Sequence, residues 1–428
     1  MSTKEFTYLP EKWDWDSIIE HVIVHYRWIF VMLLLPVSCI YDLWFYTRNK
    51  VVFALSSAPS KHREKVAFVQ SQVRDYQTKG EGKGMCTARP GWQTISPQNM
   101  SYKQRMYPIQ VNLVDVLEID AERKTVRVEP LVSMGQLTHT LDRLGWTIPI
   151  VPELDDLTVG GLVMGTGIET SSHKFGLFQH ICLSYELVLA DGSVVECTAE
   201  SDPDLFYSVP WSYGTLGFLV SVTIKIIPSK RFVKLQYYPV RSMESMVETF
   251  ERETEKSDAS DFVECLVFSK SNAVVMTGDL VDSCQPGKLN EIGRWFKPWF
   301  FKHVESFLET GSAVEYIPLR DYYHRHSRSI FWEIQDIIPF GNNVVFRYMF
   351  GWLIPPKVSL LKLTQGKTLK RLYETQHMIQ DMLVPIEDLS KSLKMFDDEV
   401  AIYPIWLCPF KMEPNPGMLN IKTDKDKM

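Results

Sequence analysis

The sequence lacks the short signatures of several large enzyme classes. After Gly165 and Gly167, the position where a dinucleotide-binding G-x-G-x-x-G fingerprint needs glycine holds Thr170. The chain also contains no P-loop, no H-E-x-x-H segment and no G-x-S-x-G segment. These absences argue against a Rossmann dinucleotide fold, a nucleotide hydrolase, a zinc protease and an α/β hydrolase.

Paired cysteines and excess positive charge are missing as well. The seven cysteines are scattered and never form C-x-x-C, so we expect reduced thiols in a cytosolic compartment, with no metal site and no disulfide framework. The 46 basic and 52 acidic residues leave a formal net charge of -6, and no basic run coincides with an aromatic stripe. Nucleic acid is therefore not an expected partner.

Two glycine-dense segments are present, Thr158–Gly167 and Trp211–Gly217. Because glycine has no Cβ, backbone amides in such segments can approach a pyrophosphate or the edge of a ring closely. The pattern favours a redox enzyme with a flat, phosphorylated cofactor. The alternative is that these glycines only serve tight turns in a β-rich domain.

One stretch departs from a soluble composition. Residues 28–46 carry a single formal charge, Asp42, and would span about 28 Å as a helix, close to the hydrocarbon thickness of a bilayer. Aromatic residues gather at its ends, as at membrane interfaces. We expect a retained anchor, either transmembrane or monotopic; the alternative is a buried helix broken at Pro36. More basic residues follow the stretch than precede it, which places the larger part of the chain in the cytosol.

The rest of the chain mixes short helices with hairpins. Helices are predicted over residues 60–77, after an N-cap at Ser133 with Leu137, Leu141 and Leu144 on one face, and over Met243–Glu255. Hairpins are predicted from Val111 to Val128 and around Asp191-Gly192, followed by a strand of alternating apolar residues that ends at Pro228. This arrangement predicts an α+β fold with largely antiparallel sheet.

Beyond residue 230 the sequence becomes rich in aromatic residues, which suits an apolar pocket, a bilayer contact or an ordinary core. We therefore divide the chain into an N-terminal membrane anchor (1–57), a cofactor-binding domain (58–230) and a substrate or cap domain (231–428).

Four longer motifs resemble one family closely: Cys86-Thr-Ala-Arg-Pro-Gly-Trp92, Pro152-Glu-Leu-Asp-Asp-Leu-Thr-Val-Gly-Gly161, Gly165-Thr-Gly-Ile-Glu-Thr-Ser-Ser-His-Lys-Phe-Gly176 and Tyr322-Tyr-His-Arg-His326. They are similar to the delta-24 sterol reductases, the Diminuto group. That family belongs to the flavin-binding superfamily of p-cresol methylhydroxylase and vanillyl-alcohol oxidase. The resemblance runs from the apolar stretch to about Phe410 and implies a two-subdomain FAD-binding domain of the vanillyl-alcohol oxidase type plus an α+β substrate cap. Family members usually continue well past Phe410, so the cap is expected to be shortened at its C-terminus. If the missing element seals the flavin site, weak FAD binding or loss of enzymatic activity is expected.

The resemblance also implies the cofactor contacts. Arg89 to Gly91 match the first pyrophosphate turn, and the main FAD loop and its continuation beside the flavin would contain Thr158, Gly160, Gly161, Gly165, Thr166, Gly167, Ser171, Ser172, His173 and Gly176. His173 is equally compatible with a structural role. Because Trp92 stands where related oxidases often carry a flavin-bonded histidine, FAD is expected to be non-covalent.

The implied reaction is NADPH-driven reduction of the side-chain double bond of a sterol in sterol biosynthesis, at the endoplasmic reticulum membrane. An isolated alkene has no electron-withdrawing group, so a positioned acid must supply a proton while cationic character is stabilised. The segment from Asp321 to Arg328, with Trp332 and Glu333, offers such groups, and the acid candidates are Tyr323, His324 and Glu333. The alternative for any one of them is contact with FAD phosphates or with a domain interface. A flavin oxidase that uses oxygen and a non-catalytic sterol-binding scaffold are the competing functions; the sequence does not predict the oligomeric state.

Overall fold

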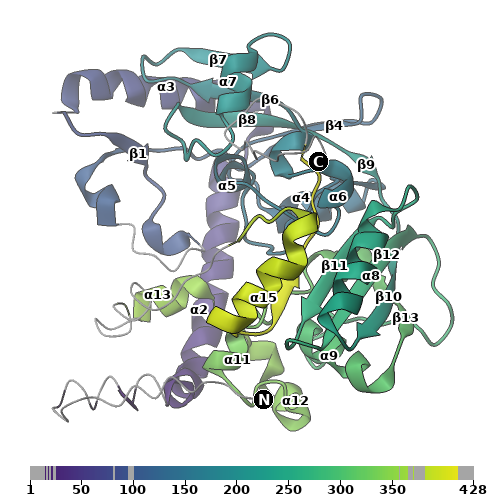
Figure 1. Cartoon of the computed structure of the whole chain (residues 1–428). Helices are drawn as coiled ribbons and strands as arrows, with labels where there is room; N and C mark the ends of the chain where they lie inside the picture. The colour runs from purple at the N-terminus through teal and green to yellow at the C-terminus, as the bar shows by residue number, and fades with distance from the viewer. Residues whose placement is uncertain are drawn as a thin grey trace.

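The computed structural model describes residues 26–80, 82–94, 101–355, 357–364 and 381–412, together with Trp15, Ile18, His21, Val22 and Lys370. Over these residues the chain forms two five-stranded sheets, two two-stranded sheets and the helices that surround them. Figure 1 shows the first large sheet at the top and the second at the lower right.

The first large sheet is antiparallel and has the strand order β3-β4-β8-β6-β7. Its strands are β3 (Val116–Asp120), β4 (Thr125–Val128), β6 (Cys182–Val188), β7 (Val194–Thr198) and β8 (Phe218–Lys225). Val126, Val128, Val222 and Ile224 are fully buried in the main hydrophobic core. The sheet therefore shields its apolar side chains from water, which is the main source of its stability.

The second large sheet has the order β13-β10-β12-β11-β14, and every neighbouring pair is antiparallel. Its strands are β10 (Phe232–Val240), β11 (Phe262–Val267), β12 (Ala273–Val281), β13 (Ala313–Pro318) and β14 (Ile405–Leu407). Helix α8 (Met243–Glu255) packs on it through Met246 and Phe250, with Leu393 of α15 (Leu389–Glu399) in the same cluster. Two packed antiparallel sheets with helices confirm the α+β prediction.

Shorter elements complete the fold. The two-stranded sheets are β1 (Met85–Thr87) with β2 (Tyr107–Ile109), which run parallel, and β5 (Trp146–Thr147) with β9 (Ile227–Pro228), which run antiparallel. Further α-helices within the described residues are α4 (Met134–Asp142), α5 (Val159–Gly165), α6 (Ser172–Phe175), α7 (Pro203–Ser208), α9 (Phe300–Thr310), α10 (Leu319–Tyr323), α11 (Glu333–Ile337), α12 (Val344–Phe350) and α13 (Val358–Thr364).

Within the described residues, the long helices α2 and α3 precede the first sheet. Helix α2 (Arg27–Ser56) is longer than the predicted stretch, because apolar residues from Val51 to Leu55 continue it past the charged side chains of Arg48 and Lys50, and Pro36 lies inside it. From Trp28 to Ser56 it is long and apolar enough to cross a membrane. Helix α3 (His62–Lys79) is amphipathic as predicted, and buries Val66, Val69 and Val73.

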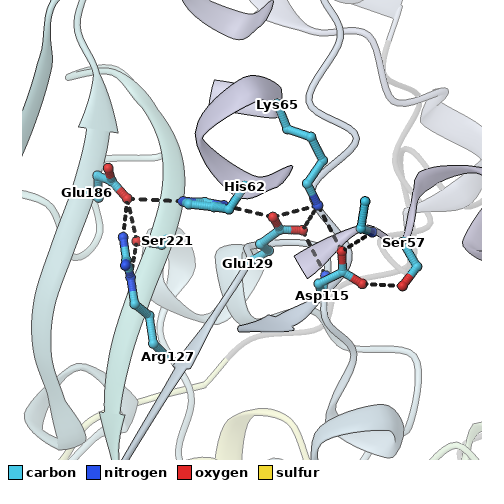
Figure 2. A network of polar contacts seen from close by, with 9 residues as sticks. Ser57, His62, Lys65, Asp115, Arg127, Glu129, Glu186 and Ser221 are labelled. Atoms are coloured by element: carbon cyan, nitrogen blue, oxygen red, sulfur yellow. Dashed lines mark hydrogen bonds and ion pairs between the residues drawn. The ribbon is translucent and has the colours of Figure 1, made fainter. Parts of the chain in front are cut away.

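A buried polar network fixes α3 to the first sheet (Figure 2). His62 lies between two carboxylates, with Nδ1 2.8 Å from Glu129 and Nε2 3.3 Å from Glu186. Lys65 donates to Asp115 at 2.9 Å and contacts the Glu129 carboxylate at 2.6 Å. Hydrogen bonds to Glu129 and Glu186 raise the pKa of His62, although burial, the largest single effect, opposes them.

Local predictions were wrong where an element is shorter than its apolar pattern. Val111 and Leu113 precede β3, so the first hairpin begins only at Val116. Helix α4 has the predicted cap, with Ser133 accepting a hydrogen bond from the Gln136 amide at 3.1 Å, but it ends at Asp142 and leaves Leu144 57% exposed. The strand predicted to reach Pro228 stops at Lys225, and residues 227–228 pair with β5 instead.

Candidate functional site

The main glycine-rich loop forms a short helix with a side-chain cap. Thr158 Oγ1 accepts a hydrogen bond from the Gly161 amide at 3.3 Å at the start of α5. A Cβ on Gly160 would lie 2.8 Å from the Pro130 ring, so only glycine fits this approach without a shift. Around the Cβ position of Gly165, by contrast, no heavy atom of the described residues comes within 4 Å, apart from its chain neighbours and the backbone of its own helix. The loop therefore has one closely packed side and one open side.

The second glycine-dense segment lies against the first. The Trp211 amide donates to Val163 O at 3.3 Å, and the Tyr213 amide donates to Met164 O at 3.2 Å. Both Trp211 and Tyr213 have positive φ angles, a backbone conformation that residues other than glycine rarely adopt. The structure thus brings together the two segments that the sequence pattern had singled out.

The predicted pyrophosphate turn lies beside two partly buried cations. Arg89 donates to Gln93 O at 3.2 Å, and Lys362 of α13 donates to Thr94 O at 2.6 Å and to Gly91 O at 3.4 Å. Burial, together with the neighbouring charge of Arg89, lowers the pKa of Lys362 to about 8. Burial also lowers the pKa of Arg89. Lys362 also donates to Thr94 Oγ1 at 2.8 Å. Two desolvated cations at one turn create a positive charge there that suits a phosphate group.

The segment after the loop holds its polar side chains by local contacts. Ser171 Oγ donates to Pro149 O at 2.8 Å, and Ser172 Oγ accepts from the Glu169 amide at 3.0 Å. The ring nitrogens of His173 lie 3.0 Å from Thr170 O and 2.9 Å from Ser260 O. These two carbonyl contacts hold the His173 ring between its own segment and the segment that contains Ser260. Gly176, at the end of α6, has φ 74 and so needs the conformational freedom of glycine.

Two of the three predicted acids lie together at the end of α10. Tyr323 Oη is 3.1 Å from Thr147 Oγ1, and burial raises the pKa of Tyr323. His324 Nδ1 is 3.1 Å from Glu153 O, and its Nε2 is 3.2 Å from Asp155. Burial lowers the pKa of His324, and the charge of Asp155 opposes this. Glu333 begins a different helix, α11, and is partly buried there.

A cluster of deeply buried charged side chains was not predicted from the sequence. Arg325 is 3% exposed and donates to Glu169 at 3.0 Å and to Glu264 at 2.9 Å. Glu264 also accepts from the Tyr322 hydroxyl at 3.3 Å and from the Trp406 indole at 2.9 Å. The family motifs contain Glu169 and Arg325, but Glu264 lies alone inside an apolar strand, where only its charge was a signal.

His326 is a second residue that the sequence reasoning passed over. Its ring is fully buried, stacks on Phe331 with a centroid separation of 4.8 Å and lies 5.8 Å from the Trp406 ring. Neither ring nitrogen has a hydrogen-bond partner within the part of the chain that the structure describes. Burial holds the pKa of His326 well below its usual value, so the ring is a neutral group beside the Arg325 cluster.

Comparison with known proteins defines the class first. A family model described as "FAD binding domain" matches residues 85–198, a range that contains every predicted cofactor residue from Arg89 to Gly176. Within the described residues, no group of three or more His, Cys, Asp or Glu side chains is placed to hold a metal ion.

Relatives then identify the family. The chain is 57% identical over 412 residues to "Delta(24)-sterol reductase" of Mus musculus, which covers 96% of this chain and 80% of that protein. It is 56% identical over 412 residues to the protein of the same name of Homo sapiens, with the same coverage. A delta(24)-sterol reductase homolog of Caenorhabditis elegans is 44% identical over 429 residues, with 97% of this chain and 82% of that protein covered. The chain belongs to the delta(24)-sterol reductase family.

Proposed function

We propose that this protein uses FAD and NADPH to reduce the side-chain (delta-24) double bond of a sterol in sterol biosynthesis. The observation that carries the proposal is family membership along nearly the whole chain, combined with an FAD-binding domain over residues 85–198. Bound FAD would supply the two-electron chemistry that side chains lack. The residues of this chain would bind the cofactor, exclude water and provide a proton.

The cofactor site is proposed to consist of the first turn and the main loop. Arg89 and Lys362 offer two desolvated positive charges beside Gly91, which supports binding of the FAD phosphates there. The open side of Gly165 leaves room for a flat group against the loop. Trp92 cannot form the covalent bond that a histidine would, and its ring instead lies 5.4 Å from the Arg48 guanidinium. FAD is therefore proposed to be exchangeable.

The two large sheets support the proposed division of the chain into an FAD-binding domain and a sterol cap. Strands β3 to β8 belong to residues 58–230, and strands β10 to β14 belong to residues 231–428. The first set would form the FAD-binding domain and the second the sterol cap. The catalytic segment Tyr323–Glu333 starts where α10 of the cap meets Thr147 and Asp155 of the first domain. A buried, protonated Tyr323 and a largely neutral His324 suit proton delivery in a dry site.

Helix α2 is proposed to lie in the plane of the endoplasmic reticulum membrane on its cytosolic side. The helix contacts the body near its start, its middle and its end: Trp28 lies 5.4 Å from Phe340, Tyr41 donates to Ser359 at 2.9 Å, and the adjoining Ser57 donates to Asp115 at 2.6 Å. A helix that crossed a bilayer would be surrounded by lipid between its ends and could not keep all three contacts.

The other side of α2 is apolar and exposed. Leu33 and Ile40 are each 72% exposed, and Leu43 is 68% exposed. Helix α12 adds Val345 and Met349, which are 66% and 58% exposed, and the turn that follows α12 packs against α2. Figure 1 shows α11 and α12 at the same end of the molecule as the start of α2. Exposed apolar side chains on two helices at the same end of the molecule suit insertion into a single leaflet, from which a sterol could enter the cap.

Product analysis tests the proposed function. Purified protein in detergent is incubated with FAD, NADPH and a sterol that carries a side-chain alkene, with and without oxygen. Mass spectrometry is expected to show a sterol that has gained two hydrogen atoms, in both atmospheres. Consumption of NADPH only in the presence of oxygen, with the sterol unchanged, would instead indicate a flavin oxidase.

A further inference from the structure

We propose that Glu153 and Glu169 share one proton inside the buried cluster around Arg325, and that this pair is the proton store for the reduction. The second half of the proposal rests on the proposed function. The first half concerns the protein alone and is tested separately.

The cluster contains more acids than bases. The side chains of Arg325, Glu169 and Glu264 are all at most 1% exposed, and one guanidinium group bonds to both carboxylates. Glu153 is 7% exposed and adds a third carboxyl group beside Glu169. Three ionised carboxylates around one cation would leave two uncompensated negative charges away from water. Burying such charges costs so much that carboxyl groups keep their protons instead.

The hydrogen-bond pattern places one of the retained protons. Glu169 Oε1 accepts from the Thr170 amide at 2.8 Å and from Arg325, whereas its Oε2 is buried with no donor among the described residues. A protonated Glu153 would supply that missing donor. Burial raises the pKa of Glu153 well above its usual value, and the charge of Glu169 and a hydrogen bond with Glu169 raise it further.

Other titratable groups face the pair. Burial also raises the pKa of Glu264, although the charge of Arg325 opposes this. Tyr322 contacts Thr170 and Glu264, and burial, the largest effect, raises the pKa of Tyr322 well above its usual value. Burial and the charges of all three glutamates raise the pKa of the Cys408 thiol. Both groups stay neutral at physiological pH. The His324–Asp155 contact borders the pair through Glu153 O, and Arg325 is the cation that bonds to Glu169.

The position of the pair links it to the cofactor loop. Glu153 precedes the loop Thr158–Gly167 and Glu169 follows it, so the pair joins the two ends of the predicted FAD loop. Glu264 of β11, and Arg325 after α10, come from the cap side. The proton store therefore lies where the cofactor loop meets the cap.

The proposed step balances. Bound FAD would, when reduced, supply the hydride that one alkene carbon receives. The glutamate pair provides the proton that reaches the other carbon, and the electrons of the π bond form the new C–H bond to that proton. The pair is left with one more negative charge beside Arg325 and recovers a proton from water before the next turnover. The pair acts through the group that contacts the sterol, so both glutamates are positioning residues in this scheme.

Infrared difference spectroscopy of the full-length protein tests the shared proton without any substrate. At neutral pH, the wild-type protein should show the C=O band of a protonated buried carboxyl that shifts in D₂O. Glu153→Gln and Glu169→Gln should each remove or displace the band. Glu315→Gln is the control. Glu315 is a partly buried carboxylate; burial tends to raise its pKa, but hydrogen bonds from His303 and Asn290 lower it overall. Its replacement should therefore leave the band unchanged.

Absence of such a band in wild-type protein would overturn the proposal, even if the variants failed to fold. Persistence of the unchanged band in both Glu153→Gln and Glu169→Gln would also overturn it. A second measurement follows oxidation of the reduced enzyme by sterol against pH. Glu153→Gln is expected to slow this half-reaction by roughly 100-fold and to change its pH profile, with NADPH oxidation retained. If the wild-type protein shows the band but does not reduce the sterol, the proposed function is refuted and the shared proton is still supported. If Glu153→Gln oxidises at the normal rate with sterol, the glutamate pair is not the proton store.

Discussion

Arg325 and Glu169 form a fully buried ion pair, with the guanidinium Nη2 3.0 Å from the carboxylate Oε1, although they lie 156 residues apart in the sequence. Glu169 follows the predicted FAD loop, and Arg325 follows helix α10 of the cap. The pair therefore fixes the cofactor loop to the cap at the place where the predicted acids Tyr323 and His324 also lie.

Replacing Arg325 should be severely destabilising. Arg325→Met leaves Glu169 and Glu264 buried without a cation, and breaking a buried pair in this way costs about 3–5 kcal/mol. Thermal or urea unfolding of the purified protein measures the loss. The matched control is Arg320→Met, because Arg320 is half exposed and lies 3.8 Å from Asp155, so it should cost less than about 1 kcal/mol. Equal effects of the two substitutions would contradict this account of the cluster.

The His62 network predicts a pH-dependent stability. Contacts with Glu129 and Glu186 raise the folded-state pKa of His62 above 6.5, so the folded protein holds the proton more tightly than the unfolded chain. The stabilisation is complete below pH 6.5 and is lost as the pH rises through the higher folded-state value. His62→Gln should abolish this part of the pH dependence.

Melting temperatures between pH 6 and 9 provide the readout for His62. His139→Gln is the control, since His139 is exposed and lies outside the network. A His62→Gln protein with the same decline in melting temperature as wild type would show that His62 is not the titrating group.

Lys362 should control FAD affinity in a pH-dependent way. Removing a charged hydrogen-bond donor from a phosphate site costs about 1.5–3 kcal/mol, or roughly tenfold to a hundredfold in affinity. Lys362→Met should show this loss at pH 7. Because the pKa of Lys362 is about 8, the wild-type affinity should itself fall as the pH rises through that value. Titration of the apoprotein with FAD measures both effects.

Two further variants separate charge from fold in that titration. Lys362→Arg should hold its affinity above pH 8, since the guanidinium stays charged. Lys225→Met, at the exposed end of β8, should bind FAD as the wild type does. Unchanged FAD affinity in Lys362→Met would place the phosphates elsewhere.

The in-plane arrangement of α2 predicts that α12 also contributes to membrane binding. Val345→Glu combined with Met349→Glu places two charges on the exposed face of α12 and should weaken partitioning onto lipid vesicles at least about tenfold. Leu144→Glu is the control, because Leu144 is similarly exposed but follows α4. A single-pass anchor makes the opposite prediction, namely that the α12 substitutions have no effect.

The parts of the fold that depend on neighbouring residues were predictable from sequence. Ser133 caps α4, Asp191-Gly192 turns a hairpin, and α8 has the predicted bounds, because each depends on contacts within one or two turns of chain. Leu144 was misassigned because its apolar spacing continues beyond the end of the helix.

The buried charges of the candidate site depend on the tertiary fold instead. Lys362 lies 271 residues from Gly91, and Arg325 lies 61 residues from Glu264. No local pattern encodes such distances, so a lone glutamate in an apolar strand gave no indication of its partner. The roles of Tyr323, His324, Glu333 and the loop residues stay predictions.

The most direct test of the account is an absorbance titration of the detergent-purified protein without oxygen. The oxidised flavin bands should bleach when NADPH is added, and they should return on addition of a sterol with a side-chain alkene but not of its saturated counterpart. Absence of flavin bands after FAD is supplied, or a bleached spectrum that the unsaturated sterol leaves unchanged, would contradict the assignment of this chain as an FAD-dependent sterol reductase.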